Sequence, residues 1–169
     1  MATRLSLRDY QRDLTARLSS AEAGRVSSKL ALQVGSEGWL IELVDAGEII
    51  PVPPITPVPL TRPWFKGVVN VRGNLHNVVD FSAFLGGPPV QVNEASRLVL
   101  LAEGLLMRSG LLVERSLGLR DMAELTLEGE ATIGTPWVRA QYADKQGKRW
   151  KELDVRQLVQ HAAFLSVGA

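Results

Sequence analysis

Six of the thirteen residues from Pro51 to Pro63 (PVPPITPVPLTRP) are proline. Because each proline removes a backbone N–H donor and fixes φ, this stretch can form neither a helix nor a central strand of a sheet. Its PxxP spacing is compatible with a ligand for an SH3 domain, but proline-rich segments act more often as stiff connectors. We therefore predict an ordered connector that crosses one end of a β-barrel.

The residues around this connector follow the period of two that is typical of strands. Leu30, Leu32 and Val34 alternate with smaller or polar residues, GSEG (35–38) is a turn pattern, and WLIELV (39–44) is a second strand pattern. Together they predict a β-hairpin. Counting such segments along the chain gives about nine or ten short strands, the pattern of small barrels.

The second half of the chain repeats the order of elements in the first. The segments WFKGVVNVRGNLHNVVDFSAFLG (64–86) and WVRAQYADKQGKRWKELDVRQLVQ (137–160) both read aromatic residue, strand, polar turn with glycine, strand, aspartate and short helix. We predict two similar β-barrel lobes, at about residues 29–90 and 91–160, joined by the segment 86–96. Short helices lie at the seams, and a C-terminal helix or tail covers about 155–169.

The first residues of the chain differ from the rest. Leu7, Tyr10, Leu14 and Leu18 recur at helical spacing, which predicts an amphipathic helix at 7–19 within an N-terminal extension of residues 1–28. Two roles remain open for this helix: it packs its leucine stripe on the barrels, or it docks a partner.

Composition excludes several classes of function. The chain has no cysteine, which rules out disulfides, iron–sulfur clusters, thiolate zinc sites and cysteine nucleophiles. A net charge of +1 gives no electrostatic case for binding nucleic acid. No signal-peptide pattern and no run of about 18 apolar residues occurs. We predict a cytoplasmic protein without membrane insertion.

The densest polar cluster in an apolar context is GVVNVRGNLHNVVDF (67–81). Gly73-Asn74 marks a turn between two strands. A three-residue loop at 73–75 keeps the odd-numbered apolar residues on one face and pairs Arg72 with His76, so we prefer it to a two-residue turn. In that register four polar side chains share the outer face: Asn70, Arg72, His76 and Asp80.

None of these residues forms a catalytic or metal-binding constellation. Asp80 precedes FSAFLGG and is a good N-cap for a short helix. His76 and His161 are the only histidines, and His76 with Asp80 lacks a third ligand, so no metal site is predicted. There is no nucleophile elbow and no glycine-rich phosphate loop. We expect no enzyme activity and no cofactor.

One family carries an ordered set of motifs like those of this chain. EII (48–50), ITPVP (55–59), FKGVVNVRG (65–73) and VVD (78–80) resemble the signature of CheW-type chemotaxis coupling proteins. The N-terminal helix, RPWFKGVVNVRGNL and LDVRQLVQHAAFLSVG look most like the PilI branch, which serves type IV pilus chemosensory systems. The resemblance implies two SH3-like five-stranded barrels in a CheW-like domain at 29–169. It also implies a non-catalytic adaptor between the cytoplasmic tip of a methyl-accepting chemoreceptor and the regulatory domain of a CheA-type histidine kinase. Such an adaptor is cytoplasmic and is recruited to membrane-associated receptor arrays.

The resemblance also implies which residues contact those partners. Arg72 and Asn70, in the NVRG motif with Gly73, match receptor-contacting positions. Lys66, Gly67 and Glu48 match positions that contact the receptor or the kinase. An arginine presented from a rigid strand suits this role, because its planar fork can bind carboxylates or carbonyl oxygens at little entropic cost.

Three alternatives stay open at this point. The first is a coupling protein of flagellar chemotaxis. The second is an oligonucleotide-binding barrel, for which the only basic and aromatic cluster is Tyr142, Lys145, Lys148, Arg149 and Trp150, diluted by Asp144, Glu152 and Asp154. The third is an enzyme or a small-molecule-binding barrel with a polar pocket.

Overall fold

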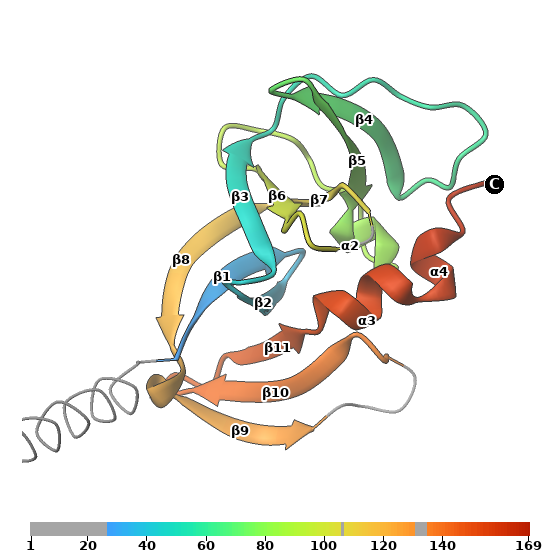
Figure 1. Cartoon of the computed structure of the whole chain (residues 1–169). Helices are drawn as coiled ribbons and strands as arrows, with labels where there is room; N and C mark the ends of the chain where they lie inside the picture. Colours follow the sequence, from blue (N-terminus) through green and yellow to red (C-terminus); the bar gives the residue numbers. More distant parts are fainter. Residues whose placement is uncertain (1–26, 106, 131–134) are drawn as a thin grey trace, which may run out of the picture.

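The computed structural model describes residues 27–105, 107–130 and 135–169, and over these ranges the chain is mainly β (Figure 1). The helix predicted at 7–19 lies outside the described residues. The described residues form eleven strands in two sheets. The six-stranded sheet has the order β8-β1-β2-β11-β10-β9, and the five-stranded sheet has the order β3-β6-β7-β5-β4.

The six-stranded sheet consists of β1 (Ser28–Val34), β2 (Glu37–Glu42), β8 (Arg115–Asp121), β9 (Leu125–Glu130), β10 (Val138–Asp144) and β11 (Arg149–Leu153). The five-stranded sheet consists of β3 (Ala46–Pro51), β4 (Phe65–Val71), β5 (Asn74–Asp80), β6 (Arg97–Leu101) and β7 (Ser109–Val113). The helices are α2 (Phe81–Phe84), α3 (Val155–Gln160) and α4 (Ala162–Leu165), and a single 3-10 turn, η1 (Met122–Glu124), links β8 to β9. Figure 1 shows the three helices together on one side of the molecule, between the sheets.

The predicted internal repeat is present, but the two repeats exchange strands. The β1–β2 hairpin of the first half joins the sheet of the second half through a parallel pairing of β2 with β11. The β6–β7 hairpin of the second half joins β5 through an equivalent parallel pairing with β7. The sheets therefore do not follow the predicted division of the chain near residue 90. Local sequence patterns identify hairpins, but they carry no information on which distant strand a hairpin edge will pair with.

After Pro51, which is the last residue of β3, the proline-rich connector contains no helix and only isolated bridges, as its composition predicts. Thr56 pairs with Val68 of β4 through N–O distances of 2.8 and 2.9 Å. In the second half the corresponding position beside β10 is held by β9, a full strand. The prediction of five strands in each lobe missed β9, and prolines explain why the first half has no counterpart.

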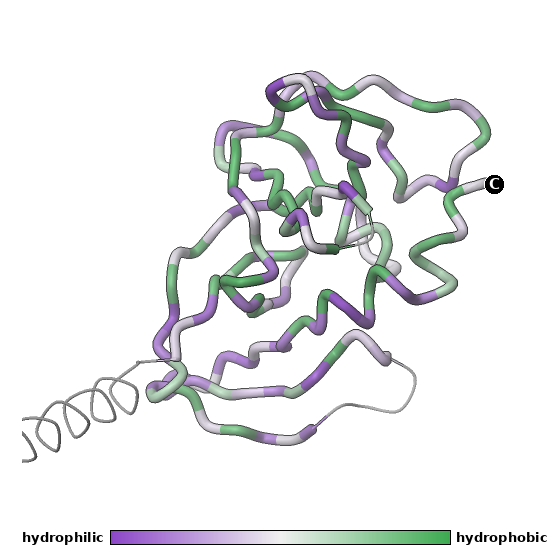
Figure 2. Tube along the Cα trace, viewed as in Figure 1, coloured by the Kyte–Doolittle hydropathy of each residue, from purple (hydrophilic) through white to green (hydrophobic). Residues whose placement is uncertain are grey.

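The central strands are nearly continuous apolar runs because their side chains enter hydrophobic clusters on both faces of the sheet. On β6, Val99 and Leu101 join a cluster shared by both sheets and the helices, while Leu98 and Leu100 join a second cluster inside the five-stranded sheet. On β2, Trp39 faces the shared cluster and Leu40 a third one with Trp150. Because successive side chains point to opposite faces, such strands are buried on both faces. Their apolar residues form long hydrophobic stretches in Figure 2.

The helices begin where the two repeats predict. Asp80 caps α2 and Asp154 caps α3, through backbone N–H groups of Ala83 and Gln157. In both repeats the N–H of this aspartate also donates to the carbonyl oxygen of the tryptophan that precedes the hairpin, at 2.8 and 2.7 Å. Trp64 and Trp137 both pack against Phe84, so the aromatic residues of the repeat meet at the seam.

Candidate functional site

The β4–β5 hairpin, which carries the NVRG motif, ends in a two-residue turn. Val71 pairs with Asn74, and Arg72 and Gly73 form the turn with φ values of 51° and 85°. Positive φ at both central residues matches the tight turns that suit the twist of a hairpin. The predicted three-residue loop with Arg72 opposite His76 is therefore wrong. The irregularity lies at the other end of the hairpin, between Phe65 and Gly67.

The altered register also changes the faces of the polar residues. Asn70 and Arg72 are exposed, as predicted, and His76 is half-buried. Asp80 is fully buried rather than outward. Its carboxylate accepts from the N–H of Ala83 at 3.0 Å and from that of Val90 at 2.9 Å. The N-cap interpretation of Asp80 is confirmed, and the carboxylate is not available to a partner.

Arg72 and Glu48 form a two-pronged ion pair on the surface. Nη1 and Nη2 of Arg72 lie 2.8 and 2.7 Å from the two carboxylate oxygens of Glu48. The pair joins β3 to the turn after β4, the two edge strands of the five-stranded sheet. Hydrogen bonds and the charge of Glu48 raise the pKa of Arg72. The Arg72 side chain nevertheless remains 75% exposed, so the guanidinium is oriented without being buried.

The other turn residues fix the shape of this tip. Oδ1 of Asn70 accepts from the N–H of Gly73 at 2.8 Å, and Nη1 of Arg108 donates to Oδ1 of Asn74 at 2.7 Å. The structure thus brings four of the predicted contact residues together in what we call the hairpin tip: Glu48, Asn70, Arg72 and Gly73. Lys66 and Gly67 lie at the opposite end of β4 and do not join them.

Gly67 has a structural role that the geometry makes plain. Its φ is 130°, and a Cβ at this position would lie 2.0 Å from the carbonyl oxygen of Thr56. The neighbouring Nζ of Lys66 lies 3.9 Å from Oδ2 of Asp80. Gly67 is therefore needed for the close approach of the connector to β4.

We expect Gly67→Ala to lower the free energy of unfolding by about 3 kcal/mol, because it adds a clash with backbone to an unfavourable φ. Urea denaturation of the variant beside Gly73→Ala tests this. A Cβ at Gly73 meets nothing within 4 Å, so that control carries only the cost of positive φ. Equal stability of the two variants would contradict the expectation.

A cavity of about 230 Å³ adjoins the hairpin tip. Its apolar part comes from Val71, Leu100 and Leu101, and its polar part includes Glu48, Arg72, His76 and Glu103. Nδ1 of His76 is buried without a hydrogen-bond partner. The sequence pattern did not place Glu103 or the β6 leucines here, because they reach the tip only through the pairing of β3 with β6.

Comparison with known proteins identifies the family. Residues 29–163 match the family described as CheW-like domain. The chain belongs to the CheW-like family. It is 29% identical to protein PilI of Pseudomonas aeruginosa over 87% of this chain and 83% of that protein. It is 26% identical to chemotaxis protein CheW of Thermotoga maritima over 79% of this chain and 80% of that protein.

The fold agrees with this membership. The crystal structure of the scaffolding protein TtCheW from Thermoanaerobacter tengcongensis matches with a TM-score of 0.67 at 19% identity, covering 81% of this chain and 94% of that chain. The resemblance and the mainly β, CheW-like fold predicted from the sequence are confirmed. Membership of the CheW-like family, which is non-catalytic, also confirms the expectation that the chain is not an enzyme.

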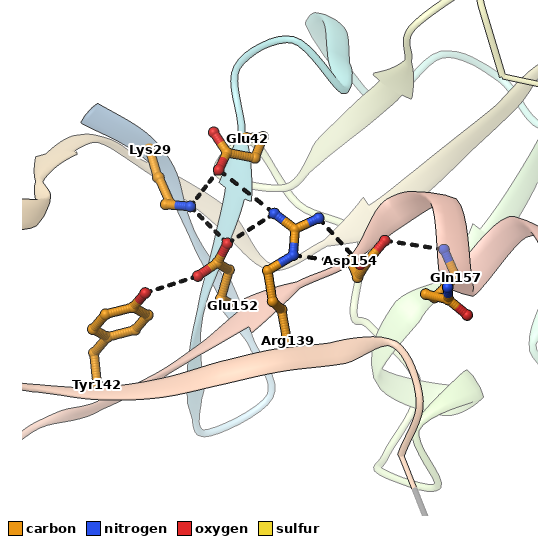
Figure 3. Close-up of polar contacts among 7 residues, drawn as sticks. All are labelled: Lys29, Glu42, Arg139, Tyr142, Glu152, Asp154 and Gln157. Carbon is orange, nitrogen blue, oxygen red and sulfur yellow. Dashed lines mark hydrogen bonds and ion pairs between the residues drawn. The ribbon is translucent and has the colours of Figure 1, made fainter. Parts of the chain in front are cut away.

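A second polar cluster, which the sequence did not reveal, joins the two halves of this CheW-like domain (Figure 3). We call this cluster the seam network, and it consists of Lys29, Glu42, Arg139, Tyr142, Glu152 and Asp154. Glu152 of β11 lies at its centre. It accepts from Nζ of Lys29 at 2.6 Å, from Nη1 of Arg139 at 3.2 Å and from the hydroxyl of Tyr142 at 3.0 Å. Glu42 also contacts Lys29, and Asp154 pairs with Arg139 at 3.1 Å. Glu152 and Asp154, whose charges dilute the basic and aromatic cluster in the sequence, are held within this network.

Two further observations concern the described part of the CheW-like chain. Over residues 27–105, 107–130 and 135–169, no three His, Asp or Glu side chains are grouped so that they could hold a metal ion. Within those same ranges, no helix is long and apolar enough to cross a membrane.

Proposed function

We propose that this CheW-like protein is a cytoplasmic adaptor that couples the tip of a methyl-accepting chemoreceptor to the regulatory domain of a CheA-type histidine kinase. We further propose that this chemosensory system controls type IV pilus twitching motility. The likeness to protein PilI over most of both chains supports the pilus system, together with the NVRG and C-terminal motifs of the sequence.

The hairpin tip is the proposed receptor contact, and the geometry of Arg72 is the observation that carries it. The Arg72 side chain is 75% exposed, while both of its Nη atoms are held by Glu48. Guanidinium has five N–H donors, so donors remain for a partner after Glu48 is bound. A side chain already fixed in this way loses little conformational entropy on docking.

The surroundings of the tip suit a helix of the receptor. Leu75 and Ile49 are exposed apolar residues on the strands next to the tip, and the adjoining cavity contributes Val71 and Leu100. A helix can place an apolar stripe on such a surface while its acidic or carbonyl groups meet Arg72. Asn70 stabilises the turn that presents the arginine.

Arg72→Glu is expected to weaken binding to a receptor cytoplasmic fragment by at least tenfold, since an interface arginine often contributes more than about 1.4 kcal/mol. The change also sets two carboxylates against each other at positions 48 and 72. The double variant Glu48→Arg/Arg72→Glu restores an internal pair with reversed polarity and serves as the matched control. Calorimetric titration with the receptor fragment and thermal melts of all three proteins give the result.

The double variant is expected to regain wild-type stability and to remain defective in binding. Wild-type recruitment of a folded Arg72→Glu protein to receptor arrays would count against the proposed contact.

Deletion of the gene is expected to abolish twitching and to leave swimming intact. Loss of swimming with normal twitching would mean that the protein serves flagellar chemotaxis instead.

A further inference from the structure

Leu60, in the connector between β3 and β4, has an unusual conformation for a large apolar residue. Its φ is 59°, and Arg72 is the only other non-glycine with positive φ in the described chain. The left-handed region is unfavourable for a residue with a bulky side chain. Leu60 is also 87% exposed, the highest value among the large hydrophobic residues described. A strained backbone that displays a leucine to solvent suggests a function for that side chain.

The end of the chain holds Leu60 in this conformation. The N–H of Ala169 donates to the carbonyl oxygen of Leu60 at 3.0 Å, and Thr61 forms a bridge with Gly168. Arg62 donates from its backbone N–H to Val167 at 2.8 Å and from Nε to the carbonyl oxygen of Ser166 at 2.8 Å. The turn that carries Leu60 is thus tied to residues 166–169 on its far side.

The chemistry around Leu60 fits a protein partner. Over residues 51–63 the one charged residue is Arg62, and Val58 is a second exposed apolar side chain. Binding to nucleic acid or to an anionic membrane surface depends on several cationic groups. A single rigid aliphatic side chain flanked by prolines suits an apolar pocket of another protein, where one anchor residue can dominate binding.

The position of Leu60 separates it from the hairpin tip. Leu60 lies five residues before Phe65, the first residue of β4, and Arg72 directly follows Val71, the last one. A strand of this length spans roughly 20 Å. Figure 1 shows the far bend of the connector on the side of the C terminus, away from the β4–β5 turn. A partner at the hairpin tip therefore leaves the Leu60 surface open to a second partner.

We propose that Leu60 is an anchor residue that inserts into an apolar pocket of a second protein, at a surface distinct from the hairpin tip. The second protein is the regulatory domain of the histidine kinase. This assignment rests on the proposed function, in which the receptor binds the hairpin tip. The left-handed turn and the C-terminal bonds orient the leucine before binding, which lowers the entropic cost of association.

Leu60→Gly tests this with little risk to the fold, because the steric strain that glycine relieves at positive φ offsets the backbone entropy that glycine adds to the unfolded chain. The variant is expected to melt at or above the wild-type temperature. Its affinity for the purified kinase regulatory domain is expected to fall about tenfold to a hundredfold, the effect of removing one buried leucine side chain. Binding to the receptor fragment is expected to stay unchanged. Leu119→Ser is the matched control, since Leu119 is 62% exposed on β8 of the other sheet.

Titration of the wild type and both variants with each partner, with sedimentation of each protein alone, separates the outcomes. Wild-type affinity of Leu60→Gly for the kinase domain overturns the anchor role while the adaptor function stands. A loss of receptor binding instead overturns the assignment of partners, and self-association that disappears in Leu60→Gly makes a second copy the partner. Failure of the wild type to bind either protein removes the proposed function itself. Selective loss of kinase binding supports the proposal.

Discussion

The fragments 1–90 and 91–169 are each expected to be unfolded alone and to fold together when they are mixed. This expectation follows from the exchange of hairpins between the two halves. In the first fragment β1 loses β8 and β2 loses β11, while β3 loses β6. What remains in the first fragment is two-stranded hairpins, which are marginally stable in water. The second fragment keeps the β6–β7 hairpin and the strands β9, β10 and β11, but it loses β2 beside β11, β5 beside β7 and β1 beside β8. The shared core cluster, with Leu30, Phe81, Val99 and Leu153 among its members, also comes from both fragments.

Circular dichroism spectra, and the dispersion of amide proton chemical shifts in NMR spectra, test this expectation on the separate and the mixed fragments. The cut lies in the segment between α2 and β6, which forms no strand and is mostly exposed apart from Val90 and Ser96, so the cut itself removes no strand pairing. Leu153→Asp in the second fragment is the control: Leu153 is buried and pairs with Ile41 across the β2–β11 contact. A buried, unpaired carboxylate there is expected to block reassembly. A cooperative melt of fragment 1–90 alone would refute the expectation.

The exchange of the β1–β2 and β6–β7 hairpins between the two halves is the part of the fold that the sequence did not predict. Hairpins, caps and the repeat depend on residues near one another, so the helix starts at Asp80 and Asp154 were predicted correctly from the pattern. The partner of each hairpin edge depends on non-local pairing, which periodicity does not encode. The turn at Arg72 was misassigned for a different reason. The three-residue loop was preferred because it keeps the odd-numbered apolar residues on one face, whereas in the structure the register shift of this hairpin lies between Phe65 and Gly67.

The candidate site likewise has a part that the sequence predicted and a part that it did not. The motif identified Glu48, Asn70, Arg72 and Gly73, and the fold brings them together because β3 and β4 are the two edges of one sheet. Whether these residues bind a receptor remains a proposal. Gly67 was grouped with them by the motif, but its close contact with Thr56 gives a structural reason for glycine. The seam network escaped prediction because Lys29 and Glu42 are far from Arg139, Tyr142, Glu152 and Asp154 in the sequence, and nothing in the pattern marks its charged residues as buried.

Glu152→Ala is expected to destabilise the protein by about 3–5 kcal/mol, because it leaves the charge of Lys29 buried beside a cavity. Glu152 is 2% exposed and Lys29 6%, so neither charge is well solvated. Glu42 still contacts Lys29, but Arg139 and Tyr142 lose a partner as well. For a domain of this size the melting temperature is expected to fall by roughly 10 °C.

A double variant distinguishes loss of a partner from loss of packing. Lys29→Met/Glu152→Leu replaces both buried charges with apolar side chains of similar volume, and such replacements of buried ion pairs are often neutral. It is therefore expected to recover most of the stability that Glu152→Ala loses. A double variant as unstable as the single one would show that the network contributes through its polar contacts rather than by compensating a buried charge.

The pH dependence of stability provides an independent measurement of the same network. Burial opposes the charged form of Lys29, but hydrogen bonds and charge from Glu152 and Glu42 outweigh it and raise the pKa of Lys29 above its ordinary value of 10.5. The unfolded chain then loses this proton at a lower pH than the folded one, so the contribution of Lys29 is complete at neutral pH and declines as pH rises beyond about 10. Urea denaturation across that alkaline range is expected to show a steeper loss of stability for the wild type than for Lys29→Met/Glu152→Leu, in which the group is absent. Parallel curves for the two proteins would mean that Lys29 has the same proton affinity folded and unfolded, and the seam network would then contribute no electrostatic stabilisation.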